Sequence, residues 1–245
     1  MFDRKKYKQF AKTQLKGRWP TPVLMTVITF LILFLLQAHE LRDFLQELSE
    51  FTITADEPLI MTDMISHSTA PIETLRTWIA MLVEFILIFA QVNVYIVLSK
   101  GPEPVGLTKF IEGLGLWGKA ILAGLWNTLW ILLWSLLFII PGIVKSYAYS
   151  QMFYLLAEFP KLPVAKAMRI SIAITRGHKA DLFMMHLSFI GWAILASIPA
   201  GIGYIWLLPY VNMSMTNAYH ALLKEALSTG IIKAEDLTSR QNSDF

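Results

Sequence analysis

Seven polar or charged side chains interrupt segments of the chain that are otherwise apolar. They are Glu84, Asn93, Asn127, Lys145, His186, Asn212 and Asn217. A polar side chain within a membrane-spanning helix faces the bundle interior or a water-filled cavity, because hydrocarbon offers it no hydrogen-bond partner. Such residues either join neighbouring helices or line a path for protons, ions or substrates. The seven residues therefore form a candidate intramembrane polar network.

Glu84 and Lys145 are the two members of this set that carry full charges. Glu84 lies about 9 Å and Lys145 about 5 Å inside the predicted outer ends of their helices, at 1.5 Å per residue, so their depths are compatible with an ion pair. In the alternative arrangement Lys145 extends to the outer interface while Glu84 is protonated or hydrogen-bonded. A functional interpretation makes Glu84 a proton or cation site. His186 is able to titrate near neutral pH, but a single histidine of this kind is more often structural.

No arrangement of residues in the sequence points to catalysis or to a bound metal or cofactor. The absence of cysteine excludes disulfides, thiolate metal sites and cysteine nucleophiles. The glycines of residues 113–118 have the spacing of a dinucleotide-binding fingerprint, but they lead into an apolar helix instead of following a strand. His39 and Glu40 begin a zinc-protease pattern whose second histidine position holds Asp43. We expect no enzyme activity, no cofactor and no metal.

The composition of the chain is that of an integral membrane protein. Of its 245 residues 55% are hydrophobic and 16% are charged, whereas soluble proteins carry about 25% charged residues. The net charge of +3 is too small to indicate nucleic acid binding. We expect membrane lipids as partners, and the sequence also allows a protein partner within the membrane.

Six segments are long and apolar enough to be helices that cross about 30 Å of hydrocarbon, which takes roughly 20 residues. They are Pro20–Ala38, Trp78–Ser99, Lys119–Ile140, Ile143–Glu158, Leu182–Ile198 and Tyr204–Leu223. Pro141 and Gly142 separate the third and fourth segments, and residues 199–203 separate the fifth and sixth, so residues 119–223 predict two tight helical hairpins. The sequence thus predicts an all-α polytopic transmembrane bundle that forms a single membrane domain over residues 1–245.

Basic residues set the predicted orientation of these crossings. With the amino terminus in the cytoplasm, 18 of the 21 lysines and arginines lie in cytoplasmic segments, as the positive-inside rule requires. Residues 1–19 then form a basic cytoplasmic amphipathic helix, and residues 39–77 form an acidic external loop that begins with an amphipathic helix. A cytoplasmic surface helix after Pro163 joins the two hairpins. Both termini are expected in the cytoplasm.

The two hairpins share a sequence pattern. Trp134 precedes Pro141 by seven residues, and Trp192 precedes Pro199 by seven residues. The hairpins are therefore candidates for a parallel internal repeat, an arrangement found in some transporters. The alternative is that so short a pattern arises by chance in apolar sequence rich in tryptophan.

The stretch from about Trp126 to Tyr219 carries a resemblance to a known family. Its residues are Trp134, Ile140, Pro141, Gly142, Tyr147, Tyr149, Ala157, Glu158, Ala167, Ser171, Gly177, His178, Lys179, Leu182, Phe183, residues 187–192, Gly201, Ile202, Gly203, Trp206, Pro209, Tyr210 and Tyr219. In this order they resemble the bacterial integral membrane proteins known as the domain of unknown function 975 (DUF975) family. The resemblance implies a polytopic inner-membrane protein of unassigned activity, and it brings no catalytic residues.

The leading functional interpretation follows from the lack of any reactive arrangement of residues. It is a non-enzymatic membrane protein that organises the envelope or serves as an accessory component. The alternative is a small-solute or lipid transporter or channel that uses Glu84, an interpretation favoured by the broken hairpins and the candidate repeat.

Overall fold

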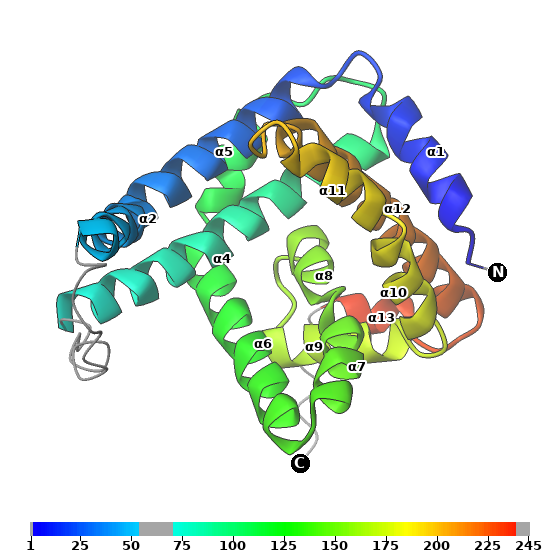
Figure 1. The fold of residues 1–245 in the computed structure, drawn as a ribbon. Coiled ribbons are helices and arrows are strands. Elements are labelled where there is room, and N and C mark those ends of the chain that lie inside the picture. Colours follow the sequence, from blue (N-terminus) through cyan, green and yellow to red (C-terminus); the bar gives the residue numbers. More distant parts are fainter. Residues whose placement is uncertain (1, 54–70, 239–245) are drawn as a thin grey trace.

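The computed structural model of the chain describes residues 2–53 and 71–238, and the regular secondary structure in these ranges is helical (Figure 1). The prediction of an all-α protein is confirmed. In chain order the helices are α1 (Arg4–Leu15), α2 (Pro20–Ile53), α4 (Pro71–Lys100), α5 (Thr108–Leu114), α6 (Trp117–Leu137), α7 (Ile139–Tyr149), α8 (Met152–Glu158), α9 (Val164–Ile174), α10 (Lys179–Leu187), α11 (Ile190–Ser197), α12 (Tyr204–Ser228) and α13 (Ala234–Leu237).

Four helical segments in the described part of the chain are long and apolar enough to cross a membrane. They correspond to the first, second, third and fifth predicted crossings, and they are Pro20–Ala38, Thr74–Lys100, Trp117–Leu137 and Lys179–Ser197. The fourth predicted crossing is divided between α7 and α8, and the sixth corresponds to the more polar helix α12. The large apolar side chains Leu136, Ile139 and Ile198 are each at least 74% exposed, as lipid-facing residues are. These features fit a multi-pass membrane protein.

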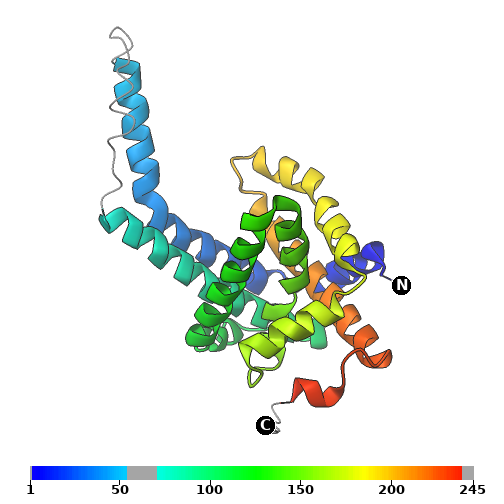
Figure 2. The same ribbon diagram turned by 90° about the horizontal axis from the view of Figure 1, so that it is seen from below.

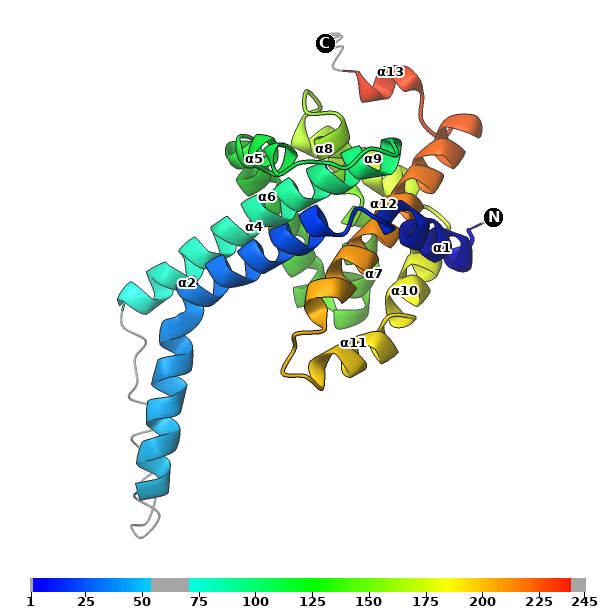
Figure 3. The same ribbon diagram turned by 90° about the horizontal axis from the view of Figure 1, so that it is seen from above.

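Helix α2 continues well beyond the first predicted crossing. It contains 34 residues, which at 1.5 Å per residue is about 51 Å, and its second half bends away from the rest of the molecule (Figure 3). The predicted external loop therefore begins with a helix, as expected. Helix α4 already starts at Pro71, so the loop is shorter than the predicted 39–77. Residues 54–70 of that loop lie outside the described residues.

Three pairs of helical segments diverge from a common centre (Figures 1 and 2). They are α2 with α4, α6 with α7, and α10 and α11 with α12. Helices α5, α9 and α13 lie at one end of the molecule, which we call the inner end, whereas the α6–α7 and α11–α12 turns lie at the opposite end (Figure 3). This arrangement places the two hairpin turns on the same side, as the predicted topology requires.

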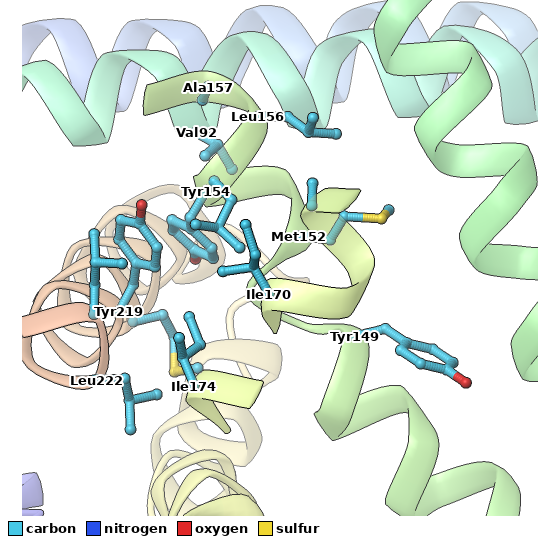
Figure 4. Packing of buried hydrophobic residues seen from close by; sticks show 14 of the residues in the cluster. Val92, Tyr149, Met152, Tyr154, Leu156, Ala157, Ile170, Ile174, Tyr219 and Leu222 are labelled. Atoms are coloured by element: carbon cyan, nitrogen blue, oxygen red, sulfur yellow. The ribbon is translucent and has the colours of Figure 1, made fainter. Parts of the chain in front are cut away.

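The main hydrophobic core lies where these helix pairs meet. It is built from α8, α9 and the inner half of α12 (Figure 4), and its fully buried or nearly fully buried members include Met152, Leu155, Leu156, Ala167, Ile174, Tyr219 and Leu222. A second core cluster joins α1, α2 and α4 through Ala11, Leu15, Met25, Leu87, Tyr95 and Leu98. Burial of these side chains is what holds the diverging helices at their inner ends.

Helix α9, predicted as a surface helix, packs more deeply than that prediction implies. Ala167, Ser171 and Thr175 are fully buried, while Arg169 on the opposite face is exposed. The helix is amphipathic, as expected, but its buried face contacts α6, α7, α8 and α12. The physical reason is that the break between α7 and α8 leaves backbone groups that α9 completes.

The first hairpin turn differs from the prediction, whereas the second lies where it was expected. Phe138 alone separates α6 from α7, so Pro141 and Gly142 lie in the first turn of α7, where proline is tolerated. Residues 198–203 connect α11 to α12, with Pro199 in the link. The structural equivalence of the two hairpins as repeats thus stays a prediction.

Candidate functional site

A polar cluster lies where the inner ends of α4, α8 and α12 meet. The Lys100 Nζ atom is 2.6 Å from Glu158 Oε1, and the Tyr219 hydroxyl donates a hydrogen bond of 2.6 Å to Glu158 Oε2. Beside this pair, Ser99 Oγ and His220 Nε2 are 2.7 Å apart. The Glu158 side chain is only 11% exposed. Two helices, α4 and α12, therefore supply the two partners of one nearly buried carboxylate on α8.

The cluster extends to the amino-terminal helix. Asn217 Nδ2 on α12 donates hydrogen bonds to Gln14 Oε1 at 2.7 Å and to the backbone oxygen of Tyr7 at 3.4 Å. Gln14 Nε2 in turn donates to the backbone oxygen of Ser99 at 3.3 Å. We refer to the side chains joined in this way as the inner network, which consists of Gln14, Ser99, Lys100, Glu158, Asn217, Tyr219 and His220. The inner network ties α1, α4, α8 and α12 together.

The ring of Tyr219 is fixed by the core beneath it. It stacks on Tyr154 with ring centroids 5.3 Å apart and planes inclined by 22° (Figure 4). Tyr219 is fully buried. The stacking therefore orients the hydroxyl toward Glu158, because a buried aromatic ring has few alternative rotamers.

The break in the fourth predicted crossing is closed by hydroxyl groups of α9. Ser171 Oγ donates to the backbone oxygen of Ala148 at 2.8 Å and accepts from the backbone N–H of Gln151 at 3.2 Å. Thr175 Oγ1 also approaches the Ala148 oxygen, at 3.4 Å. Ser171, Thr175 and Gln151 are fully buried. The side chains of α9 thus replace hydrogen bonds that a continuous helix would have made.

The break in the fifth crossing is closed by basic residues of α1. Lys8 Nζ donates to the backbone oxygen of Ser188 at 3.2 Å and lies 3.8 Å from the centroid of the Phe189 ring. Arg4 donates to the backbone oxygen of Met184 at 3.2 Å. Cations at the carboxyl end of a helix are favourable because that end carries a partial negative charge. Burial and the nearby charges of Arg4 and Lys12 lower the pKa of Lys8.

A histidine joins the start of α10 to α12. His178 Nδ1 lies 3.1 Å from Asp181 Oδ2, and His178 Nε2 lies 3.3 Å from Glu225 Oε1. The Phe2 ring stacks against the imidazole at 5.9 Å. Within residues 2–53 and 71–238, no three histidine or carboxylate side chains are grouped as metal ligands.

Three of the seven predicted site residues make hydrogen bonds, each in a different part of the structure. Asn93 Nδ2 donates to the backbone oxygen of Lys109 at 2.9 Å, which holds α5 against α4. Asn217 belongs to the inner network. His186 Nδ1 lies 3.1 Å from the backbone oxygen of Leu182, one turn earlier in its own helix, and its ring packs on Tyr147 at 5.6 Å.

Of the two arrangements left open for Glu84 and Lys145, the ion pair is not formed. Lys145 Nζ lies 4.3 Å from the centroid of the Trp134 ring, a cation–π contact within the α6–α7 hairpin. Glu84 is exposed on α4 and has no ion pair or hydrogen bond with another described residue. The depths of the two residues permitted a pair. Lys145 on α7 instead contacts the Trp134 ring on α6, the other helix of the same hairpin.

The remaining two predicted residues lie in the bundle without forming part of a network. Asn127 Oδ1 is buried and has no hydrogen-bond partner among the described residues. Asn212 lies beside the fully buried Tyr95 hydroxyl, which makes no hydrogen bond of ordinary geometry to it or to Thr26. The structure therefore does not join the seven predicted residues into one site.

Sequence reasoning missed the inner network, although a signal for it exists. Ser99 and Glu158 are the final residues of the second and fourth predicted crossings, both at the cytoplasmic side. Lys100 follows Ser99 directly, so a lysine and a glutamate were predicted at the same depth. Depth together with opposite charge would have paired them.

Comparison with known proteins confirms the resemblance. Residues 137–226 match a family model described as "Protein of unknown function (DUF975)". No curated protein and no solved structure matches the chain. The matched stretch reaches from the end of α6 into α12 and contains Glu158, Ser171 and Tyr219.

Proposed function

We propose that this chain is a six-crossing protein of the bacterial inner membrane with both termini in the cytoplasm. In this arrangement α7 with α8 makes the fourth crossing and α12 makes the sixth. The position of α5, α9 and α13 at one end of the molecule supports it (Figure 3), as does the excess of basic residues in the segments predicted to be cytoplasmic.

We further propose that the protein acts without catalysis, as an accessory or envelope-organising component of that membrane. The observation that carries this proposal is how the chain uses its polar side chains. Glu158, Asn217 and Asn93 each bind a neighbouring helix or the segment beside it. Hydrogen bonds of this kind hold membrane bundles together. These polar groups therefore have a structural role.

The six-crossing topology is tested by cysteine labelling, for which the chain is well suited because it contains no cysteine. Phe138 is 69% exposed in the α6–α7 turn, and Arg169 is exposed on α9. A membrane-impermeant maleimide added to intact spheroplasts should label Phe138→Cys, and it should label Arg169→Cys only after permeabilisation. Labelling of both positions in intact spheroplasts would mean that α7 with α8 does not cross the membrane, and labelling of Arg169→Cys alone would reverse the proposed orientation.

The accessory function is tested by native purification. Extraction into lipid nanodiscs should recover the protein with a second membrane protein in a fixed ratio. If the isolated chain instead showed saturable thermal stabilisation by one solute, the accessory function would be wrong.

Transport of a small solute or lipid is a second candidate function. It is favoured by the exposure of Glu84 within α4 and by the two interrupted crossings, because discontinuous helices line binding sites in many transporters. On this proposal, Glu84→Gln should abolish a pH-dependent flux in proteoliposomes while leaving the folded yield unchanged. An unchanged flux would exclude Glu84 as the transport site.

A further inference from the structure

Glu84 lies deep within the longest apolar crossing segment. It is ten residues from Thr74 and sixteen from Lys100, the two ends of that segment, which at 1.5 Å per residue is about 15 Å and about 24 Å. Its side chain is exposed, and Ile88, one turn further along α4, is 39% exposed. The Glu84 carboxylate therefore lies near the middle of a crossing and is exposed on the outer surface of the helix bundle.

The packing of α4 shows which side this is. Leu87 and Gln91 face α2, where Gln91 Nε2 donates to Thr29 Oγ1 at 2.7 Å. Phe85 faces α6, where its ring packs directly on Gly124. At 100° per residue, Glu84 and Ile88 fall on the strip of α4 between these two seams. Neither neighbouring helix covers this strip, which also includes the partly exposed Met81.

The described residues provide no counter-ion for the carboxylate. Lys145, the cation whose predicted depth was compatible with a pair, lies on the Trp134 ring. A carboxylate in hydrocarbon is unfavourable unless a cation or hydrogen-bond donor reaches it. A cation that pairs with this carboxylate would therefore come from outside the described residues.

We propose that the strip formed by Met81, Glu84 and Ile88 docks a transmembrane helix of another membrane protein, which places a lysine or arginine against Glu84. Charge complementarity identifies the occupant, because the strip presents one acid among apolar side chains. A second copy of this chain fits less well, since Lys145 is occupied. This inference rests on the accessory function proposed above and names the chemistry of its partner.

A defined peptide tests the docking strip. A synthetic transmembrane helix of leucines with one central lysine, and an all-leucine twin, are mixed with the labelled full-length protein in phosphatidylcholine vesicles. Energy transfer should show the lysine helix binding the wild-type protein about tenfold more tightly than Glu84→Gln, as one interhelical charge-assisted contact would give. The all-leucine helix should not distinguish them. Glu112→Gln, which removes an exposed acid of α5, is the matched control and should bind as the wild type does.

Three results would overturn the proposal. The first is equal binding of both peptides to the wild-type protein. The second is energy transfer between copies of the protein alone that is lost in Glu84→Gln, which would make the occupant a second copy. The third is rapid labelling of Ile88→Cys by an impermeant maleimide in vesicles, which would make the strip an aqueous surface. The peptide measurement needs no native partner, so its failure leaves the accessory function to be judged separately by native purification.

Discussion

Replacement of Ser171 by alanine tests whether α9 stabilises the break between α7 and α8. The substitution removes the hydroxyl that donates to the Ala148 oxygen and accepts from the Gln151 N–H. The Ala148 oxygen keeps only the longer bond from Thr175, at 3.4 Å. The Gln151 N–H loses its partner in a fully buried position.

The size of the effect follows from that stranded amide. A buried polar group left without a partner costs about 1–3 kcal/mol, and the interior of the bundle offers little water to replace the lost hydroxyl. Hydrogen bonds between side chains of membrane helices average only about 0.6 kcal/mol, but Ser171 serves two backbone groups at once. We therefore expect Ser171→Ala to lower the free energy of unfolding by about 2 kcal/mol.

The assay is unfolding in mixed micelles of increasing SDS content, followed by the fluorescence of the eight tryptophans. Ser197→Ala is the matched control, because the exposed Ser197 hydroxyl donates only to the Ile194 oxygen of its own helix, and it should change stability by no more than about 0.5 kcal/mol. If the two variants lost the same stability, the role assigned to α9 at the break would be refuted.

Three further substitutions probe the other contacts. Gly203→Ala places a Cβ atom 2.6 Å from a backbone atom of α11 and should cost about 2 kcal/mol in the same assay; Gly191→Ala, with open space around it, should not destabilise, and equal losses would contradict the clash. Tyr219→Phe leaves a nearly buried carboxylate without one donor and should cost about 1–3 kcal/mol. Tyr204→Phe at the outer end of the same helix is its control, and a matching loss there would count against the hydrogen bond. Asn217→Leu should free α1 from α12, seen as faster proteolysis near the amino terminus; unchanged proteolysis would show that apolar packing suffices.

Apolar segment length was enough to predict the helical class and the four helical segments that are long and apolar enough to cross a membrane. It could not predict the interruptions at Ser150 and Ser188. Neither position is next to proline or glycine in the sequence, so no local signal marks it. The interruptions are completed by Ser171 and Lys8, which come from other helices. Long-range contacts of this kind are not encoded in the segment that breaks.

The sequence predicted how deep each candidate residue lies along its helix, but it did not predict which neighbour its side chain faces. Counting residues placed Glu84 and Lys145 at similar levels, and that estimate depends only on the helix rise. Whether two side chains meet also depends on how each helix is rotated about its axis, which packing decides. Asn93 turns toward α5 and Lys145 toward α6, so residues at compatible depths ended with different partners.

The two interruptions differ in when their partners are synthesised. Ser171 follows the α7–α8 break by some twenty residues, so the partner of this break is synthesised soon after it. Arg4 and Lys8 precede their acceptors by 180 residues. The first helix must therefore stay available while most of the chain is inserted, and the α10–α11 segment reaches its final form only when that early helix returns to it. Loss of residues 1–15 would thus impair the assembly of the α10–α11 segment, whose carbonyl acceptors lie 180 residues further along the chain.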